Sequence, residues 1–273
     1  MTLPRYLPPE HVIEGARVRK SVLTVAAAAL LLTACDPAPA PPPAPPALAP
    51  PATDVAGLVG TARTGIGHAP SAAFTTTAVF GPATQKYTGS LRFDGGETSL
   101  SMVFDSGETR VIGKRTFTRT PQEAIPGKPW IGTDAGSADP VAQALGAGVP
   151  LAVKLPDLGR ALAEIERTGR LVSAGQTKLG DVPVNHYRLE LDPAKAPELF
   201  PEFGPQPGAA KVPAQLWLDA AARPVRYAVD FSAGPAAAKG TTDYRDWGKP
   251  VDIQAPPADQ VVDEVELLKK LGR

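Results

Sequence analysis

Cysteine, net charge and aromatic residues are all scarce in this sequence. A single cysteine among 273 residues excludes a disulfide framework within the chain. Lysine and arginine together number 28, as do aspartate and glutamate, so there is no basic excess to bind nucleic-acid phosphates. We therefore expect no nucleic-acid partner.

The motifs of common catalytic and cofactor sites are also missing. The sequence holds no G-x-S-x-G nucleophile elbow, and its glycines have neither Walker nor Rossmann spacing. His68 and His186, the two histidines after the N-terminal region, lack the spacing of a metal-binding pair. We expect no metal, no cofactor and no enzymatic activity.

The N-terminal region, residues 1–34, has the features of a signal peptide. Basic residues between 17 and 20 precede an apolar run over 21–34. That run has 14 residues, fewer than the ~20 that a membrane-spanning helix needs. The sequence therefore predicts export of everything that follows.

The end of this signal resembles the lipobox of bacterial lipoproteins. Residues 32–35 read Leu-Thr-Ala-Cys. In such lipoproteins diacylglycerol is attached to the cysteine sulfur, and cleavage leaves that cysteine as the first residue. The resemblance implies that an S-diacylglyceryl group on Cys35 inserts among membrane lipids on the outer face of the bacterial cytoplasmic membrane. The alternative is an ordinary cleaved signal with an incidental cysteine.

Residues 35–53, which begin at the lipidated cysteine, form a linker rich in proline and alanine. Nine prolines fall between residues 36 and 52. Such a segment favours extended polyproline II structure, which at ~3.1 Å per residue reaches roughly 50 Å. We interpret it as a spacer between the membrane anchor and a folded domain; a proline-rich recognition segment is the alternative.

Alternating apolar and polar residues predict many strands in a folded domain over 54–262, with a C-terminal tail at 263–273. The strands are expected at 87–93, 100–104, 109–112, 116–119, 170–179, 183–191, 213–219, 224–232, 241–247 and 251–253. Short turns separate most of them, which indicates antiparallel pairing.

Helical spacing of apolar residues occurs in only a few places. Asp54 precedes an amphipathic helix over 55–66. A second helix is expected over 157–168, with Asp157 as its cap and Gly169 just after its end. Further helices are expected at 137–145 and 258–271. Because few helices accompany many strands, we predict an α+β fold in which helices cover the apolar face of one large curved antiparallel sheet.

Several segments resemble the LppX/LprG family of actinobacterial lipoproteins, which have a LolA-like fold. They are the lipobox 32–35, the strand segment 180–187, the hairpin 216–219 with 223–226, and the ending 244–253. The likeness covers residues 54–262. It implies a half-barrel wrapped around helices, with an apolar cavity that holds the acyl chains of a lipid or lipoglycan for transport or assembly in the cell envelope.

The residues expected to line that cavity follow from the apolar faces of the predicted strands and helices. They are Leu100, Met102, Phe104, Leu145, Leu158, Leu162, Ile165, Tyr187, Leu189, Leu216, Leu218, Tyr227 and Val229. Two alternatives stay open. In the first, this fold is an envelope sensor or interaction module with a membrane-protein partner. In the second, the chain is a structural surface lipoprotein with a filled core.

Overall fold

A computed structural model of the chain describes residues 47–94, 97–119, 121–123, 125–139, 141, 151–200, 210–232 and 237–270. The predicted signal peptide, Cys35 and Leu145 lie outside these ranges, as does most of the helix expected at 137–145.

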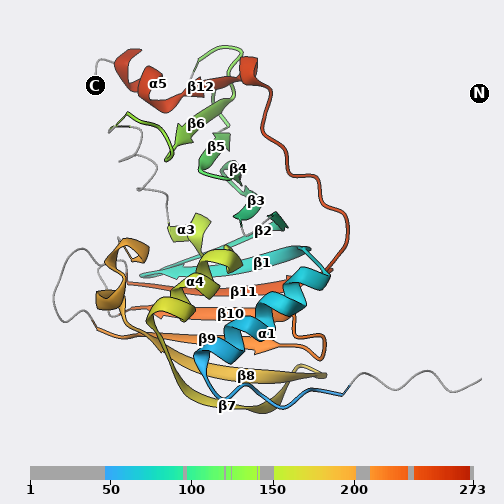
Figure 1. Cartoon of the computed structure of the whole chain (residues 1–273). Coiled ribbons are helices and arrows are strands. Elements are labelled where there is room, and N and C mark those ends of the chain that lie inside the picture. The colour runs from blue at the N-terminus through green and yellow to red at the C-terminus, as the bar shows by residue number, and fades with distance from the viewer. Residues whose placement is uncertain are drawn as a thin grey trace, which may run out of the picture. The chain divides into compact units, whose positions relative to one another are not determined.

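One sheet of twelve strands dominates the described residues (Figure 1). Its spatial order is β12-β6-β5-β4-β3-β2-β1-β11-β10-β9-β8-β7. The strands are β1 (Ser71–Phe80), β2 (Ala83–Asp94), β3 (Glu97–Phe104), β4 (Gly107–Ile112), β5 (Arg115–Arg119), β6 (Trp130–Asp134), β7 (Gly169–Leu179), β8 (Val182–Leu191), β9 (Val212–Leu218), β10 (Pro224–Phe231), β11 (Ala238–Arg245) and β12 (Val261–Asp263). Neighbouring strands are antiparallel throughout, except that β12 pairs with β6 in parallel.

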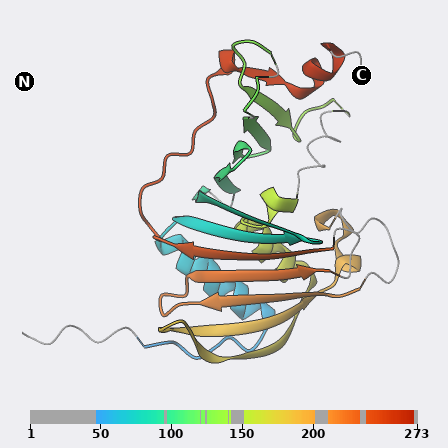
Figure 2. The ribbon, with the colours of Figure 1, turned by 180° about the vertical axis from the view of Figure 1, so that it is seen from behind.

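Helices are few, as predicted. They are α1 (Val55–His68), α3 (Leu151–Lys154), α4 (Leu158–Thr168) and α5 (Glu264–Lys270), with 3-10 turns at Pro193–Lys195, Pro197–Leu199 and Ala258–Gln260. Helices α1 and α4 lie across the same face of the sheet, in front of the strands in Figure 1 and behind them in the reversed view of Figure 2. We call this the inner face. The predicted α+β class, with one large antiparallel sheet and few helices, is confirmed.

Local signals explain both covering helices. The Asp54 side chain accepts a hydrogen bond from the Gly57 amide at 2.7 Å and so caps α1. Asp157 caps α4 by accepting from the Arg160 amide at 3.0 Å. Gly169 ends α4 with an extended backbone and not with the left-handed one that is typical of a glycine at a helix end. A Cβ there would lie 2.3 Å from the carbonyl oxygen of Ile165.

The hydrophobic core lies between the inner face and the two helices. Alternate residues of each strand point inward, as in β8, where Tyr187, Leu189 and Leu191 are buried. The helices contribute apolar stripes such as Leu58 and Val59 of α1. These residues form one continuous cluster. Burying it supplies the main stabilisation of the fold.

Several parts of the structure differ from the sequence predictions, which included neither β6 nor α3. Strand β1, in the middle of the sheet, was not predicted. Residues 251–253 do not form a strand. The helix expected over 258–271 is a 3-10 turn, then β12, then α5.

Candidate functional site

The residues predicted to line a cavity come together in the hydrophobic core. Eleven are buried members of one cluster: Leu100, Met102, Leu158, Leu162, Ile165, Tyr187, Leu189, Leu216, Leu218, Tyr227 and Val229. Phe104 is partly buried and packs against that cluster. The predicted faces of the strands and of α4 are therefore the inward ones.

The interior beneath α3 and α4 is closely packed. A Cβ on Gly240 of β11 would lie 2.3 Å from a methyl carbon of Leu155. The void between these helices and β10 measures only about 10 Å³. Gly240 thus makes room for the Leu155 side chain, and an acyl chain needs more space than this void offers.

Four tyrosines point inward from the sheet, and three of them bond to a chain segment that covers it. The Tyr87 hydroxyl donates to the Ala152 carbonyl of α3. Tyr244 donates to the Pro156 carbonyl at 3.3 Å, just before α4. The Tyr187 hydroxyl accepts from the Ala52 amide at 3.0 Å, at the end of the linker. These hydroxyls hold the covering segments on an otherwise apolar face.

The fourth tyrosine, Tyr227 of β10, is different. Its side chain lines the small void, and its buried hydroxyl has no hydrogen-bond partner. Burial raises the pKa of Tyr227 well above its usual range, and the nearby Glu164 carboxylate raises this pKa further. The hydroxyl therefore stays protonated and remains a hydrogen-bond donor.

A buried ion pair on α4 faces the same void. Arg160 Nε lies 2.5 Å from Glu164 Oε1, and only 6% of the Glu164 side chain is exposed. The Arg160 guanidinium also donates to the Leu199 carbonyl. Lys154 of α3 lines the void as well. Two cations and one carboxylate thus line the void together with Tyr227.

A larger hollow, which we call the notch, opens where β3 parts from β2. The pairing of these strands ends at Thr88 and Val103, although β2 begins five residues earlier, at Ala83. The notch has a volume of about 790 Å³. Its lining is Thr84, Gln85, Lys86, Tyr87, Thr88, Val103, Phe104, Asp105 and Ser106.

The two walls of the notch differ in character. Tyr87 and Phe104 form the inner wall, with ring centroids 4.6 Å apart, and both pack into the hydrophobic core. Val103 points the other way and is 57% exposed. The notch is therefore a surface hollow whose inner side is formed by two aromatic rings of the core region.

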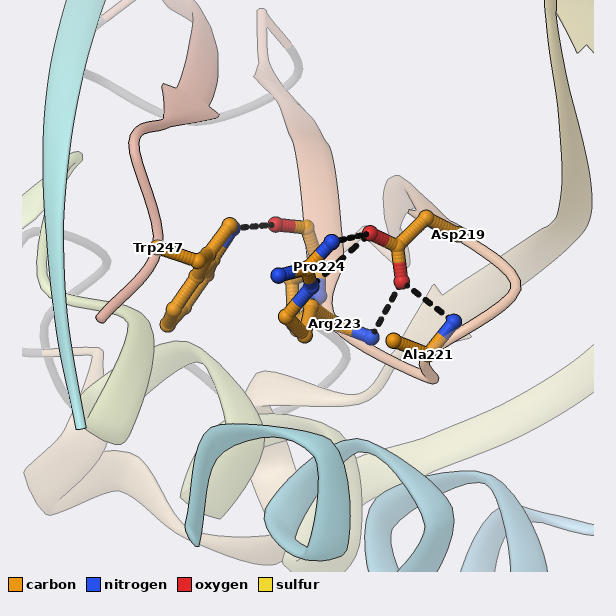
Figure 3. A network of polar contacts seen from close by, with 5 residues as sticks. All are labelled: Asp219, Ala221, Arg223, Pro224 and Trp247. Carbon is orange, nitrogen blue, oxygen red and sulfur yellow. Dashed lines mark hydrogen bonds and ion pairs between the residues drawn. The ribbon is translucent and has the colours of Figure 1, made fainter. Parts of the chain in front are cut away.

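The β9–β10 turn fixes the position of α1 (Figure 3). Asp219 accepts hydrogen bonds from the backbone amides of Ala221 and Arg223 and forms an ion pair with the Arg223 guanidinium at 2.8 Å. Trp247 Nε1 donates to the Pro224 carbonyl at 3.0 Å. The turn packs so closely on α1 that a Cβ on Gly65 would lie 2.3 Å from the Ala222 carbonyl oxygen.

The end of the linker is held against the edge of the sheet. Gln176 of β7 and Asn185 of β8 both donate to the Ala49 carbonyl, each at 3.1 Å. Together with the bond from Ala52 to Tyr187, they fix residues 49–52 beside β7 and β8 (Figure 1). The chain thus approaches the domain at the β7 edge.

No protein-family model matches this chain, and no curated protein matches its sequence. Among solved structures, it is similar to the lipoprotein LppX of Mycobacterium tuberculosis: TM-score 0.47, 12% identity, 73% of this chain and 98% of LppX. It is similar to LprF of Mycobacterium bovis: TM-score 0.45, 15% identity, 76% of this chain and 99% of LprF. A LolA superfamily protein of Nitrosomonas europaea gives a TM-score of 0.34 at 10% identity, over 74% of this chain and 96% of that protein.

These similarities are ones of fold. LppX is among them, as the sequence resemblance predicts.

Groups that would bind a metal do not gather in the described ranges, where no three His, Cys, Asp or Glu side chains meet. His186 stacks on Trp217 with ring centroids 4.5 Å apart, and its Nε2 lies 2.9 Å from Gln215 Oε1. That ring is therefore part of a packed pair. Within the same ranges, no helix is long and apolar enough to cross a membrane.

Sequence reasoning missed the notch but found part of its wall. Phe104 was predicted as an inward residue, and Asp105 with Ser106 as a turn. The opposite wall, residues 83–86, shows no alternation of apolar and polar residues, so β2 was predicted to begin only at Tyr87. The signal that would have found the notch is the unequal length of β2 and β3.

Proposed function

We propose that this chain is an extracytoplasmic lipoprotein, anchored to the outer face of the cytoplasmic membrane through Cys35, that binds the acyl chains of a lipid or lipoglycan. We propose a role in lipid transport or assembly in the envelope, without catalysis. The notch is the observation that carries this proposal, because its lining includes Tyr87 of the apolar core and Phe104, which packs against that core.

The size and chemistry of the notch support this function. Ligand sites commonly measure about 300–1,000 Å³, and the notch has about 790 Å³. Burying an acyl chain is favourable by about 0.8 kcal/mol per CH₂, so even a few methylenes against the inner wall give useful affinity. Since the interior next to it is filled, deeper binding requires α3 to move, and α3 is joined to β2 by the Tyr87 hydrogen bond.

The test is lipid uptake by the full chain, purified in a non-ionic amphipol. Native mass spectrometry and lipid extraction would first reveal a bound lipid. A fluorescent fatty-acyl probe would then be titrated into wild-type protein, Val103→Lys and Val172→Lys. Both valines are exposed, at 57% and 49%, but only Val103 lines the notch.

We expect Val103→Lys to weaken uptake about tenfold, because a charge in the notch opposes entry of an apolar chain. Val172→Lys, the matched control on β7, should bind like the wild type. A bare protein that takes up no probe would refute lipid binding and favour an interaction module. Equal uptake by all three proteins would place the site elsewhere.

The anchor is tested separately. Replacing Cys35 by alanine removes the sulfur that would carry the diacylglyceryl group. Stable anchoring takes more than one acyl chain, and this group supplies two. The variant should lose its membrane-bound, lipid-labelled form in fractionation with radiolabelled palmitate. Unchanged labelling would contradict lipidation at this cysteine.

A further inference from the structure

Tyr227 is the inward tyrosine whose hydroxyl has no partner. The hydroxyls of Tyr87, Tyr187 and Tyr244 each bond to the backbone of a covering segment. Tyr227 is only 3% exposed, and its oxygen is buried and unbonded. Since buried polar groups are almost always hydrogen-bonded, such a hydroxyl calls for an explanation.

The surroundings of this hydroxyl indicate which group it would bind. The void beside it, about 10 Å³, is the size of a single water-sized atom group. Arg160, Lys154 and Glu164 supply its polar lining, with more positive than negative charge. Leu151, Leu155, Ala161, Val229 and Phe231 supply the apolar remainder. A small negatively charged oxygen attached to an apolar molecule suits this combination.

We propose that Tyr227 donates a hydrogen bond to the oxyanion of a bound acyl lipid, a carboxylate or a phosphate. This inference rests on the proposed lipid-binding function and names the chemical class of the head group. Arg160 adds charge from a fixed position, because Glu164 and the Leu199 carbonyl already orient its guanidinium. The acyl part would lie along the apolar residues of α3 and β10.

The position of α3 links this site to the notch. Ala152 of α3 accepts the hydrogen bond from Tyr87 in the notch wall, and Leu151 and Lys154 of the same helix line the void. A displacement of this one short helix would therefore join the two spaces. A lipid could then enter through the notch and place its head group beside Tyr227.

The experiment compares Tyr227→Phe with Tyr244→Phe in the full chain, held in a non-ionic amphipol. Both residues are buried on the inner face of adjacent strands, but only Tyr244 has a hydrogen-bond partner. The probes are dihexanoyl phosphatidic acid, octanoate, the uncharged dihexanoylglycerol, and inorganic phosphate. Calorimetry gives the dissociation constants, and thermal melting shows that each variant is folded.

Wild-type protein should bind at least one of the two anionic lipids about tenfold more tightly than dihexanoylglycerol, as expected for a hydrogen bond to a charged group. Tyr227→Phe should abolish this preference while its affinity for dihexanoylglycerol stays unchanged. Tyr244→Phe should keep the preference. Which anionic lipid is preferred decides between a phosphate and a carboxylate head group.

Three other results would refute the head-group site, the lipid-binding function or the lipid assignment. If dihexanoylglycerol binds but neither anionic lipid is preferred, or if Tyr227→Phe keeps the preference, the head-group site is refuted while lipid binding stands. If none of the lipids binds, the proposed function fails and this inference fails with it. If inorganic phosphate alone binds as tightly as phosphatidic acid, the ligand is a free anion and the lipid assignment is overturned.

Discussion

Replacing Gly65 by alanine should destabilise the protein, although alanine is the better helix former. Gly65 is buried in the last turn of α1, where that helix meets the β9–β10 turn. An added Cβ would lie 2.3 Å from the carbonyl oxygen of Ala222 and 2.4 Å from its carbonyl carbon. Asp219 holds this turn with four hydrogen bonds, two of them within its ion pair with Arg223, so the backbone cannot move away cheaply.

The magnitude follows from two opposing contributions. Glycine to alanine within a helix stabilises by about 1 kcal/mol. Forcing extra volume into a packed contact costs about 1–3 kcal/mol, and a clash with fixed backbone belongs at the upper end of that range. We therefore expect Gly65→Ala to lower the free energy of unfolding by about 2 kcal/mol.

Gly60 of the same helix provides the matched control. It is exposed, and a Cβ there would meet no atom within 4 Å. Gly60→Ala should stabilise by about 1 kcal/mol. Urea unfolding, followed by the fluorescence of Trp247 beside this turn, measures both variants. If Gly65→Ala proves as stable as Gly60→Ala, the close packing of α1 on the β9–β10 turn is wrong.

Three further predictions concern groups that hold the covering segments or the outer face. Asp157→Ala removes the cap of α4 and should cost about 1 kcal/mol in urea unfolding, whereas Asp157→Asn should recover most of it. Tyr187→Phe removes the acceptor of the Ala52 amide, so hydrogen exchange at Ala52 should accelerate while the amide of Leu216 stays protected. Burial lowers the pKa of His186, so the unfolded chain takes up this proton more readily than the native one. Stability should therefore fall as the pH drops through about 6.5, the unfolded value, and His186→Gln should reduce this dependence.

The two covering helices, α1 and α4, and most strands could be predicted because their signals are local. Asp54 and Asp157 mark two helix starts, and both side chains bond as expected of N-caps. Strand β8 alternates cleanly between inward residues such as Tyr187 and outward ones such as Arg188. Each of these features depends on residues within a few positions of one another.

Strand β1 escaped prediction because most of its inward positions are small or polar. Ala72, Phe74, Thr76 and Ala78 point inward, and threonines occupy much of the outward face. Thr76 is buried without leaving its hydroxyl unpaired, because that hydroxyl forms a hydrogen bond with the Thr242 hydroxyl on β11 at 2.9 Å. The partner lies 166 positions away in the chain, so no local pattern reveals it.

The same limit applies to the tyrosines, and it explains why the candidate site could be predicted only in part. Alternation shows that Tyr187 and Tyr227 point inward, but not what their hydroxyls bond to. The partner of Tyr187 is a backbone group 135 positions away. For Tyr227 the structure supplies no partner, although phenylalanine would fill the same space without a buried hydroxyl. An unpaired buried hydroxyl costs about 1–3 kcal/mol, so a core that served packing alone would be more stable with phenylalanine. An oxygen of a bound lipid would offset that cost, as the proposed head-group site at Tyr227 requires.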